Sequence, residues 1–104
     1  LSTAVHHKIN TITIIMNNKS WGAEKAYQRD FYNERYIGAD IKSPPFHKLA
    51  EIYGAKGYHV SQLQDLKQAV SDALICDKPA IINIDVDPKA LYSFRKDSFK
   101  HRSK

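Results

Sequence analysis

The stretch TITIIMNNKSWGAEKAYQRDFY, residues 11–32, decides the fold. Its first part, residues 11–17, is β-branched and mostly apolar, which predicts a central parallel strand buried on both faces. Over residues 22–38, apolar side chains recur at a spacing of four, which indicates a helix. A strand that leads directly into a helix is typical of an α/β protein. In such folds ligands bind at the carboxyl end of the strand, here at NNKS.

The downstream sequence repeats this alternation. Residues 46–53 place apolar side chains on one helical face, with Ser43 as the expected N-cap and Gly54 at the expected left-handed end. Residues 57–60 then fit a short strand. The chain is therefore expected to return to the sheet after this helix.

A second helix and strand follow. Ser61 and Gln64 are spaced as a capping box, and apolar residues line one face of a helix over residues 63–74. Residues 80–86, AIINIDV, form another continuous β-rich run. Strands separated by helices need crossover connections, so the sequence predicts an α/β fold, a three-layer parallel sheet with crossover helices.

The composition is that of one small globular domain. The chain has 104 residues, 42% of them hydrophobic and 26% charged, which is ordinary for such a domain. Its apolar runs are far shorter than the ~20 residues of a membrane span, and its start lacks the pattern of a secretory signal. Cys76 is the single cysteine, so no disulfide can form within the chain, and a reducing, cytoplasmic setting is expected.

The positive charge is concentrated at the end of the chain. Residues 89–104 hold six basic side chains against Asp97 alone, and the difference equals the formal net charge of +5. We therefore expect a neutral body, residues 1–88, and a basic tail, residues 89–104. The tail is either a solvated terminus or an anion site. A nucleic-acid-binding protein would spread Lys and Arg over its folded body, so we expect no nucleic-acid partner and no membrane partner.

The polar residues after the first strand suggest a metal site. Asn17, Asn18, Lys19 and Ser20 lie at the binding edge of the expected sheet. An Asn amide oxygen can complete the octahedral oxygen shell of Mg²⁺, an ion that also binds phosphates. Asn pairs at strand ends are also common turn formers that bond their own backbone. The residues alone leave both interpretations open.

These residues resemble a known family. An apolar strand that ends in Asn-Asn, followed by an aromatic-Gly pair, resembles the second half of the cofactor motif of thiamine-diphosphate-dependent enzymes, whose first half is Gly-Asp-Gly. The segment NNKSWGAEKAYQRDFY is also similar to acetohydroxyacid synthases. WGAEK, together with FRKD near the end, looks most like sulfoacetaldehyde acetyltransferases. The resemblance covers nearly the whole chain.

The resemblance implies thiamine diphosphate and Mg²⁺ as cofactors and assigns roles by position. Asn18 would be a side-chain ligand of Mg²⁺, and Ser20 would contribute its backbone carbonyl. Gly22 would leave room beside the diphosphate, as a residue without a side chain does. Trp21 and Tyr27 would face the active-site cavity, with Tyr27 over the substrate.

The resemblance also implies a reaction. Sulfoacetaldehyde and phosphate, both small molecules, would be converted to acetyl phosphate and sulfite. Arg95 and Lys96 are candidates to hold the sulfonate or phosphate, because a guanidinium matches such oxygens with two parallel hydrogen bonds. An acetolactate synthase-like carboligase or a decarboxylase is the alternative activity.

The chain departs from the family pattern upstream of the Asn pair. Seventeen residues precede Asn18, too few to reach the Gly-Asp-Gly half of the motif. We therefore expect a fragment that is inactive by itself. An uncovered sheet edge would favour self-association, so a homo-oligomer is expected. From other protein classes, a small α/β binding or receiver module and a basic-tailed nucleic-acid-binding module remain alternatives.

Overall fold

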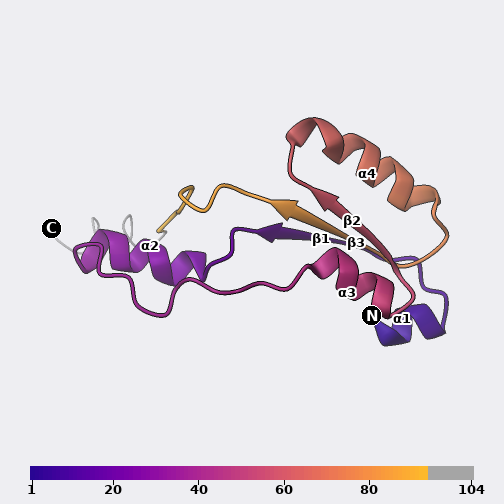
Figure 1. Ribbon diagram of the computed structural model, residues 1–104, viewed down its shortest axis with the longest axis horizontal. Helices are drawn as coiled ribbons and strands as arrows, with labels where there is room; N and C mark the ends of the chain where they lie inside the picture. Colours follow the sequence, from indigo (N-terminus) through magenta and orange to yellow (C-terminus); the bar gives the residue numbers. More distant parts are fainter. Residues whose placement is uncertain (94–104) are drawn as a thin grey trace, which may run out of the picture. The chain divides into compact units, whose positions relative to one another are not determined.

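The computed structural model describes residues 1–93, and Arg95 and Lys96 lie outside this part. Seven elements follow in chain order (Figure 1): α1 (Ser2–His6), β1 (Ile12–Asn17), α2 (Gly22–Phe31), α3 (Phe46–Ile52), β2 (Lys56–Val60), α4 (Leu63–Ile75) and β3 (Ala80–Asp85). The chain divides into two compact units. The first unit contains Leu1–Asn17 and Ser43–Val86, and the second contains Asn18–Lys42 and the residues from Asp87 onward. The expected boundary between residues 88 and 89 stays a prediction.

The first unit is built on a parallel sheet of three strands. Their order is β1-β3-β2, and both outer strands run parallel to β3. Ile82 at the centre of β3 lies opposite Ile14 on one side and Tyr58 on the other. Strands that alternate with helices and run parallel confirm the α/β fold with crossover connections.

The central strand is β3, and the prediction of a central β1 was wrong. Within residues 1–93, β1 pairs with β3 alone. Its side chains Ile14 and Met16 are 48% and 67% exposed. An apolar, β-branched run indicates a strand whose side chains favour burial. It does not indicate how many strands pair with it, and a central strand needs a neighbouring strand on each side. The described residues supply a neighbour on each side for β3 only.

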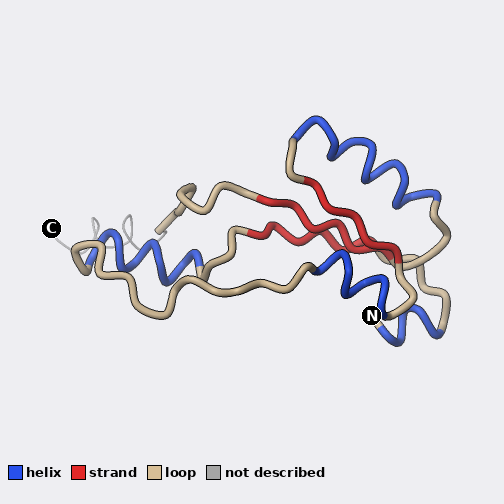
Figure 2. Tube along the Cα trace, in the orientation of Figure 1, coloured by secondary structure: helices blue, strands red, loops and turns tan. Residues whose placement is uncertain are grey.

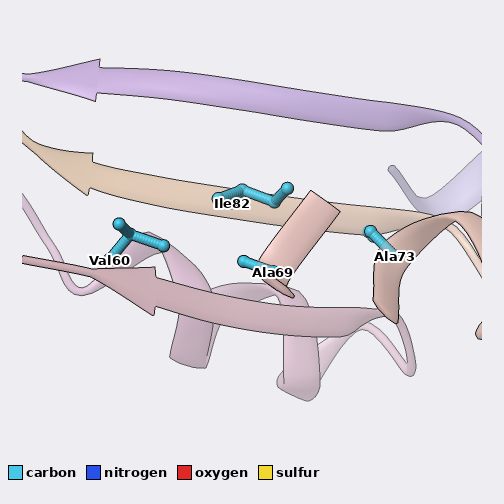
Figure 3. Packing of buried hydrophobic residues seen from close by; sticks show 5 residues of the cluster. Val60, Ala69, Ala73 and Ile82 are labelled. Atoms are coloured by element: carbon cyan, nitrogen blue, oxygen red, sulfur yellow. The ribbon is translucent and has the colours of Figure 1, made fainter. Parts of the chain in front are cut away.

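One face of the sheet is covered by α4. Figure 3 shows Ala69 and Ala73 of this helix beside Val60 and Ile82 of the sheet, and all four are buried. Alanine lets the helix backbone approach the strands closely, while the larger residues fill the space around it. Leu63 and Leu74, expected on the buried face of α4, are instead exposed. The sheet is narrow, so the helix buries only the middle of its apolar stripe.

The other face is covered by α1 and α3, so that helices lie on both sides of the sheet (Figure 1). The buried residues there are Ala50, Ala55 and Ile81, packed against Val5 and Phe46. The sheet and its two helical faces form the three layers expected from the sequence. None of the helices among residues 1–93 has the length and apolar character required to cross a membrane.

Two of the expected helix caps are absent. Helix α3 begins after Pro45 and not after Ser43, and α4 begins after Gln62 with no side-chain cap bond. The spacing of Ser61 and Gln64 matched a capping box, but the helix starts one residue later than that pairing requires. Gly54 has φ of +83°, which confirms the expected left-handed helix end.

Helix α2 is shorter than expected. It ends at Phe31, although a helix was expected over residues 22–38. Asn33 and Glu34 adopt left-handed backbone angles, with φ of 53° and 58°, which stop a right-handed helix. The tan loop that follows in Figure 2 carries residues 32–45 to α3.

The contact of β2 with α3 depends on a glycine. A Cβ atom added to Gly57 would lie 1.8 Å from the carbonyl oxygen of His47 and 2.6 Å from its carbonyl carbon. Both atoms belong to the backbone and cannot move aside as a flexible side chain can. Gly57 therefore lets the start of α3 lie directly against the strand.

Replacing Gly57 by alanine is expected to destabilise the first unit by about 3 kcal/mol or more, because overpacking against backbone is not relieved by rotamer changes. Urea unfolding followed by circular dichroism measures this loss. Gly38→Ala is the matched control. Gly38 has φ of +64° and open space around it, so alanine should cost about 1–2 kcal/mol there. Equal losses in the two variants would contradict the close approach.

Candidate cofactor-binding turn

A short turn connects β1 to α2 and contains the candidate site. The ladder of β1 with β3 continues one bond beyond the strand, where the N–H of Val86 donates to the carbonyl of Asn17 at 3.1 Å. The chain then turns through residues 18–21 and enters α2 at Gly22. Lys19 has φ of 56°, which reverses the direction of the backbone. The four polar residues NNKS therefore lie at the carboxyl end of a parallel strand, as expected.

Asn18 organises the turn. Its side-chain Oδ1 accepts a hydrogen bond from the N–H of Ser20 at 3.1 Å. This is the turn-forming role that the sequence left open as one of two interpretations. A carbonyl oxygen has two lone pairs, so this bond leaves Oδ1 able to accept a second partner. The turn-forming role and the role of a metal ligand are therefore compatible.

The backbone N–H and C=O of Ser20 point toward the side of the turn on which the Asn18 amide lies. It forms an isolated antiparallel bridge with Asp40. The flanking bonds run from Trp21 N–H to the Ala39 carbonyl at 2.7 Å and from Ile41 N–H to the Lys19 carbonyl at 3.0 Å.

In this pattern the bridged pair itself exchanges no hydrogen bonds. The N–H and C=O of Ser20 therefore face away from residues 39–41. The N–H meets Asn18 Oδ1, so the Ser20 carbonyl lies on the side of the Asn18 amide. Two neutral oxygen atoms are thus presented together, which is the type of ligand that Mg²⁺ prefers.

Gly22 is required by the position of the Asn18 amide. A Cβ atom on Gly22 would lie 2.8 Å from Asn18 Nδ2, closer than such atoms approach each other. The next nearest side-chain atom, Cδ2 of Leu91, would be 3.8 Å away. The glycine therefore leaves space that the Asn18 side chain occupies in part.

The start of α2 suits an anion. Trp21 is the N-cap residue, and its side chain makes no capping bond. The first N–H groups of the ten-residue helix are therefore not satisfied by a side-chain cap, and they carry the positive end of the helix dipole. Such a helix start next to a glycine is a common place for phosphate groups.

The side chains around the turn differ in burial. Trp21 is 58% exposed. The hydroxyl of Ser20 is buried and has no hydrogen-bond partner among the described residues. Tyr27 is half-buried, with its ring 5.5 Å from the ring of Phe31. The structure brings Asn18, Ser20 and Gly22 together, while Arg95 and Lys96 lie outside the described residues.

The neighbouring cations of α2 are engaged by carboxylates. Lys25 Nζ lies 2.6 Å from Asp40 Oδ1, and its ammonium group lies 5.2 Å from the centre of the Tyr36 ring. Arg29 Nε lies 2.8 Å from Asp30 Oδ1, and this hydrogen bond raises the pKa of Arg29 above its ordinary value. The contacts of Lys25 join α2 to the loop after it, whereas the Arg29–Asp30 pair lies within α2.

The residues 39–41 were missed by sequence reasoning. They pair with the turn through Ala39, Asp40 and Ile41, yet they lie about twenty positions downstream and form no strand with a recognisable pattern. A single bridge has no periodicity, so the sequence carried no signal for it.

The fit to Mg²⁺ and a diphosphate is good but incomplete. The turn supplies two oxygen ligands, a glycine and an uncapped helix start. Among residues 1–93, no group of three or more His, Cys, Asp or Glu side chains is arranged to hold a metal ion. The turn therefore contributes neutral oxygen ligands.

Comparisons with known proteins identify the family to which the chain belongs. Residues 1–84 match the family described as thiamine pyrophosphate enzyme, C-terminal TPP binding domain. The chain is 32% identical over 102 residues to a sulfoacetaldehyde acetyltransferase from Alcaligenes xylosoxydans xylosoxydans, covering 94% of this chain and 17% of the relative. It is 29% identical over 94 residues to a probable acetolactate synthase large subunit from Methanococcus aeolicus, covering 89% of this chain and 16% of the relative.

A solved structure shares the fold. The thiamine diphosphate-dependent 4-hydroxybenzoylformate decarboxylase of Rhodococcus jostii RHA1 superposes with a TM-score of 0.75 at 30% identity, covering 83% of this chain and 16% of that one. The chain thus spans 16 to 17% of the length of these relatives. The cofactor of the matched family is thiamine diphosphate, with Mg²⁺ alongside it. The match over residues 1–84 shows that the chain belongs to the C-terminal TPP-binding domain family of thiamine pyrophosphate enzymes.

Proposed function

We propose that this chain is the diphosphate-binding part of a thiamine-diphosphate- and Mg²⁺-dependent acetyltransferase that converts sulfoacetaldehyde and phosphate to acetyl phosphate and sulfite. The observation that carries the proposal is the turn at residues 18–22, where the Asn18 amide oxygen and the Ser20 carbonyl lie on one side. The 32% identity to a sulfoacetaldehyde acetyltransferase supports the choice of substrate.

The residues of the turn have separate roles in this proposal. Asn18 and Ser20 donate oxygen ligands to Mg²⁺, and Gly22 keeps the space in which the Asn18 amide lies. The uncapped N–H groups at the start of α2 face the diphosphate. Trp21 and Tyr27 line the substrate cavity. When bound, thiamine diphosphate supplies the carbanion-stabilising chemistry of the reaction.

Positive charge is needed for the two anionic groups of the substrates. We assign this role to Arg95 and Lys96, which lie beyond the described residues. Their charge would attract the sulfonate and the phosphate, and the Arg95 guanidinium would orient one of them with paired hydrogen bonds. The sequence of this chain contains no Gly-Asp-Gly, the first half of the cofactor motif, so we expect it to be inactive without further protein.

A carboligase or decarboxylase is the second candidate activity. The 29% identity to an acetolactate synthase subunit and the structural match to a decarboxylase favour it. Both candidates use the same turn, so the turn does not discriminate between them. For either activity we propose a cytoplasmic homo-oligomer that acts on small molecules.

The substrate is tested with the protein encoded by the complete reading frame. Given thiamine diphosphate, Mg²⁺ and phosphate, it should release sulfite from sulfoacetaldehyde and form acetyl phosphate in equal amounts. Pyruvate in place of sulfoacetaldehyde is the matched control. Formation of acetolactate or carbon dioxide from pyruvate, with no sulfite from sulfoacetaldehyde, would favour the second candidate.

Asn18→Ala in the same protein is expected to lower the affinity for thiamine diphosphate by at least about tenfold, the effect of losing one metal ligand or its supporting partner. Isothermal titration at several Mg²⁺ concentrations measures this loss and the weakened Mg²⁺ dependence. Asn10→Ala is the matched control, because the Asn10 amide bonds the exposed Asp77 carboxylate and Asn10 precedes β1, whereas the turn follows it.

The melting temperature of Asn18→Ala, measured without cofactor, separates the structural role of Asn18 in the turn from its role as a metal ligand. Losing one partly exposed hydrogen bond should cost only about 1 kcal/mol of stability. If Asn18→Ala left affinity and Mg²⁺ dependence unchanged, the proposed metal role would be wrong.

Gly22→Ala is expected to keep the fold and weaken cofactor binding. The added Cβ meets the end of the Asn18 side chain, which can swing away, and alanine gains about 1 kcal/mol of helix propensity over glycine. The displaced amide no longer lies beside the Ser20 carbonyl, so affinity should fall. Calorimetric titration and thermal unfolding measure the two effects. Ala23→Ser, one residue along on an exposed position, should change neither, and an unaltered affinity in Gly22→Ala would contradict the geometry.

A further inference from the structure

A cavity of about 330 Å³ lies at the end of α2. It is lined by Gln28, Tyr32, Arg35 and Ile37, all of them within Asn18–Lys42 of the second unit. None of the four belongs to the turn at residues 18–22. Cavities that bind small molecules begin at about 300 Å³ and are mostly apolar with a few polar groups. The size and the lining of this one are therefore suitable for a small ligand.

Gln28 builds the wall of the cavity. Its side-chain Nε2 donates to the Ile37 carbonyl at 2.9 Å, and the Ile37 N–H donates to its Oε1 at 3.2 Å. Its own backbone carbonyl accepts from the N–H groups of Tyr32 and Glu34, at 3.2 and 3.0 Å. Both polar atoms of the Gln28 side chain bond the loop at Ile37, so Gln28 positions the cavity.

The loop is held in an unfavourable backbone conformation. Asn33 and Glu34 are consecutive residues with positive φ, 53° and 58°. Asn adopts such angles more readily than most residues, whereas they are uncommon for Glu, and strained conformations gather at ligand sites. The hydrogen bonds of Gln28 to Tyr32, Glu34 and Ile37 hold this bend. The result is that Tyr32 and Arg35 lie at the two sides of the bend and both line the cavity.

Arg35 lines the cavity without a carboxylate partner among the described residues. Lys25 is paired with Asp40 and Arg29 with Asp30. The guanidinium of Arg35 makes no ion pair or side-chain hydrogen bond with any residue in the described range 1–93. Its five N–H donors are arranged to bind a planar pair of oxygen atoms. An oxyanion would satisfy them.

The remaining walls are apolar and open to solvent. Tyr32 is 57% exposed and Ile37 is 80% exposed. A ligand that covered both side chains would remove their apolar surface from water, which is favourable in proportion to the area buried. A simple inorganic anion would not do so, because it would reach only Arg35.

We propose that this cavity binds a small organic anion, with its sulfonate, carboxylate or phosphate group on the Arg35 guanidinium and its apolar part between Tyr32 and Ile37. Gln28 acts as the positioning residue. The site requires neither thiamine diphosphate nor Mg²⁺. If the anion does not bind, the proposed function is unaffected, and if the proposed function is wrong, the anion site is unaffected.

The proposal is tested by titrating the isotope-labelled 104-residue chain with benzenesulfonate and, separately, with inorganic sulfate, followed by amide NMR shifts. Benzenesulfonate should give saturable shifts confined to residues 28–37, with an affinity at least about tenfold above that of sulfate, since its ring buries apolar area. Equal affinities for the two anions, or shifts that do not saturate, would overturn the proposal.

Variants separate the two halves of the site. Arg35→Gln should lower benzenesulfonate affinity by about tenfold or more, and Arg35→Lys by less, because lysine keeps the charge but loses the paired geometry. Ile37→Ser should lower the affinity for benzenesulfonate and leave the affinity for sulfate unchanged. Lys48→Gln removes the same charge from the exposed face of α3 and is the matched control. Affinity in Arg35→Gln equal to that in Lys48→Gln, with α2 signals intact, would show that Arg35 does not bind the anion.

Discussion

Parallel pairing of both outer strands with β3 is the constraint on which the rest of the structure depends. Ile82 is fully buried between the strands that flank it. Because all three strands run in one direction, their carboxyl ends meet at one edge, where Asn17 lies opposite Asp85. One further bond, from Val86 N–H to the Asn17 carbonyl, fixes the residue at which β1 leaves the sheet. That residue is followed directly by Asn18.

A few hydrogen bonds define the turn after β1. Each of them satisfies one polar group of the turn and leaves another polar group able to bind a ligand. Asn18 Oδ1 takes the Ser20 N–H, and the bridge to residues 39–41 takes the backbone groups on either side of Ser20. What remains is the second lone pair of Asn18 Oδ1, the Ser20 carbonyl and the start of α2. A rigid turn with unsatisfied oxygen atoms is well suited to a cation, since no reorganisation is needed before the ion binds.

The strands and most helices were predictable because their signals are local. β-Rich runs predicted β1 and β3, the short segment at residues 57–60 predicted β2, and Gly54 predicted a helix end that the structure confirms. The edge position of β1 was not predictable, because it depends on which neighbours are present and not on its own side chains. The end of α2 at Phe31 was also missed. There the bonds of Gln28 to the loop hold a bend in which Asn33 and Glu34 adopt left-handed angles that their residue types do not demand.

The candidate site shows the same division between local and distant contacts. Asn18, Ser20 and Gly22 were assigned from the resemblance to the family, and they lie together because a turn of five residues brings its own members together. Asp40 was not identified, because its bridge to Ser20 joins segments twenty positions apart with no repeating pattern. The same bridge brings Asp40 within 2.6 Å of Lys25, which neutralises a cation beside the turn. Asp40, which the sequence did not indicate, therefore helps to hold the turn in shape through its bridge to Ser20.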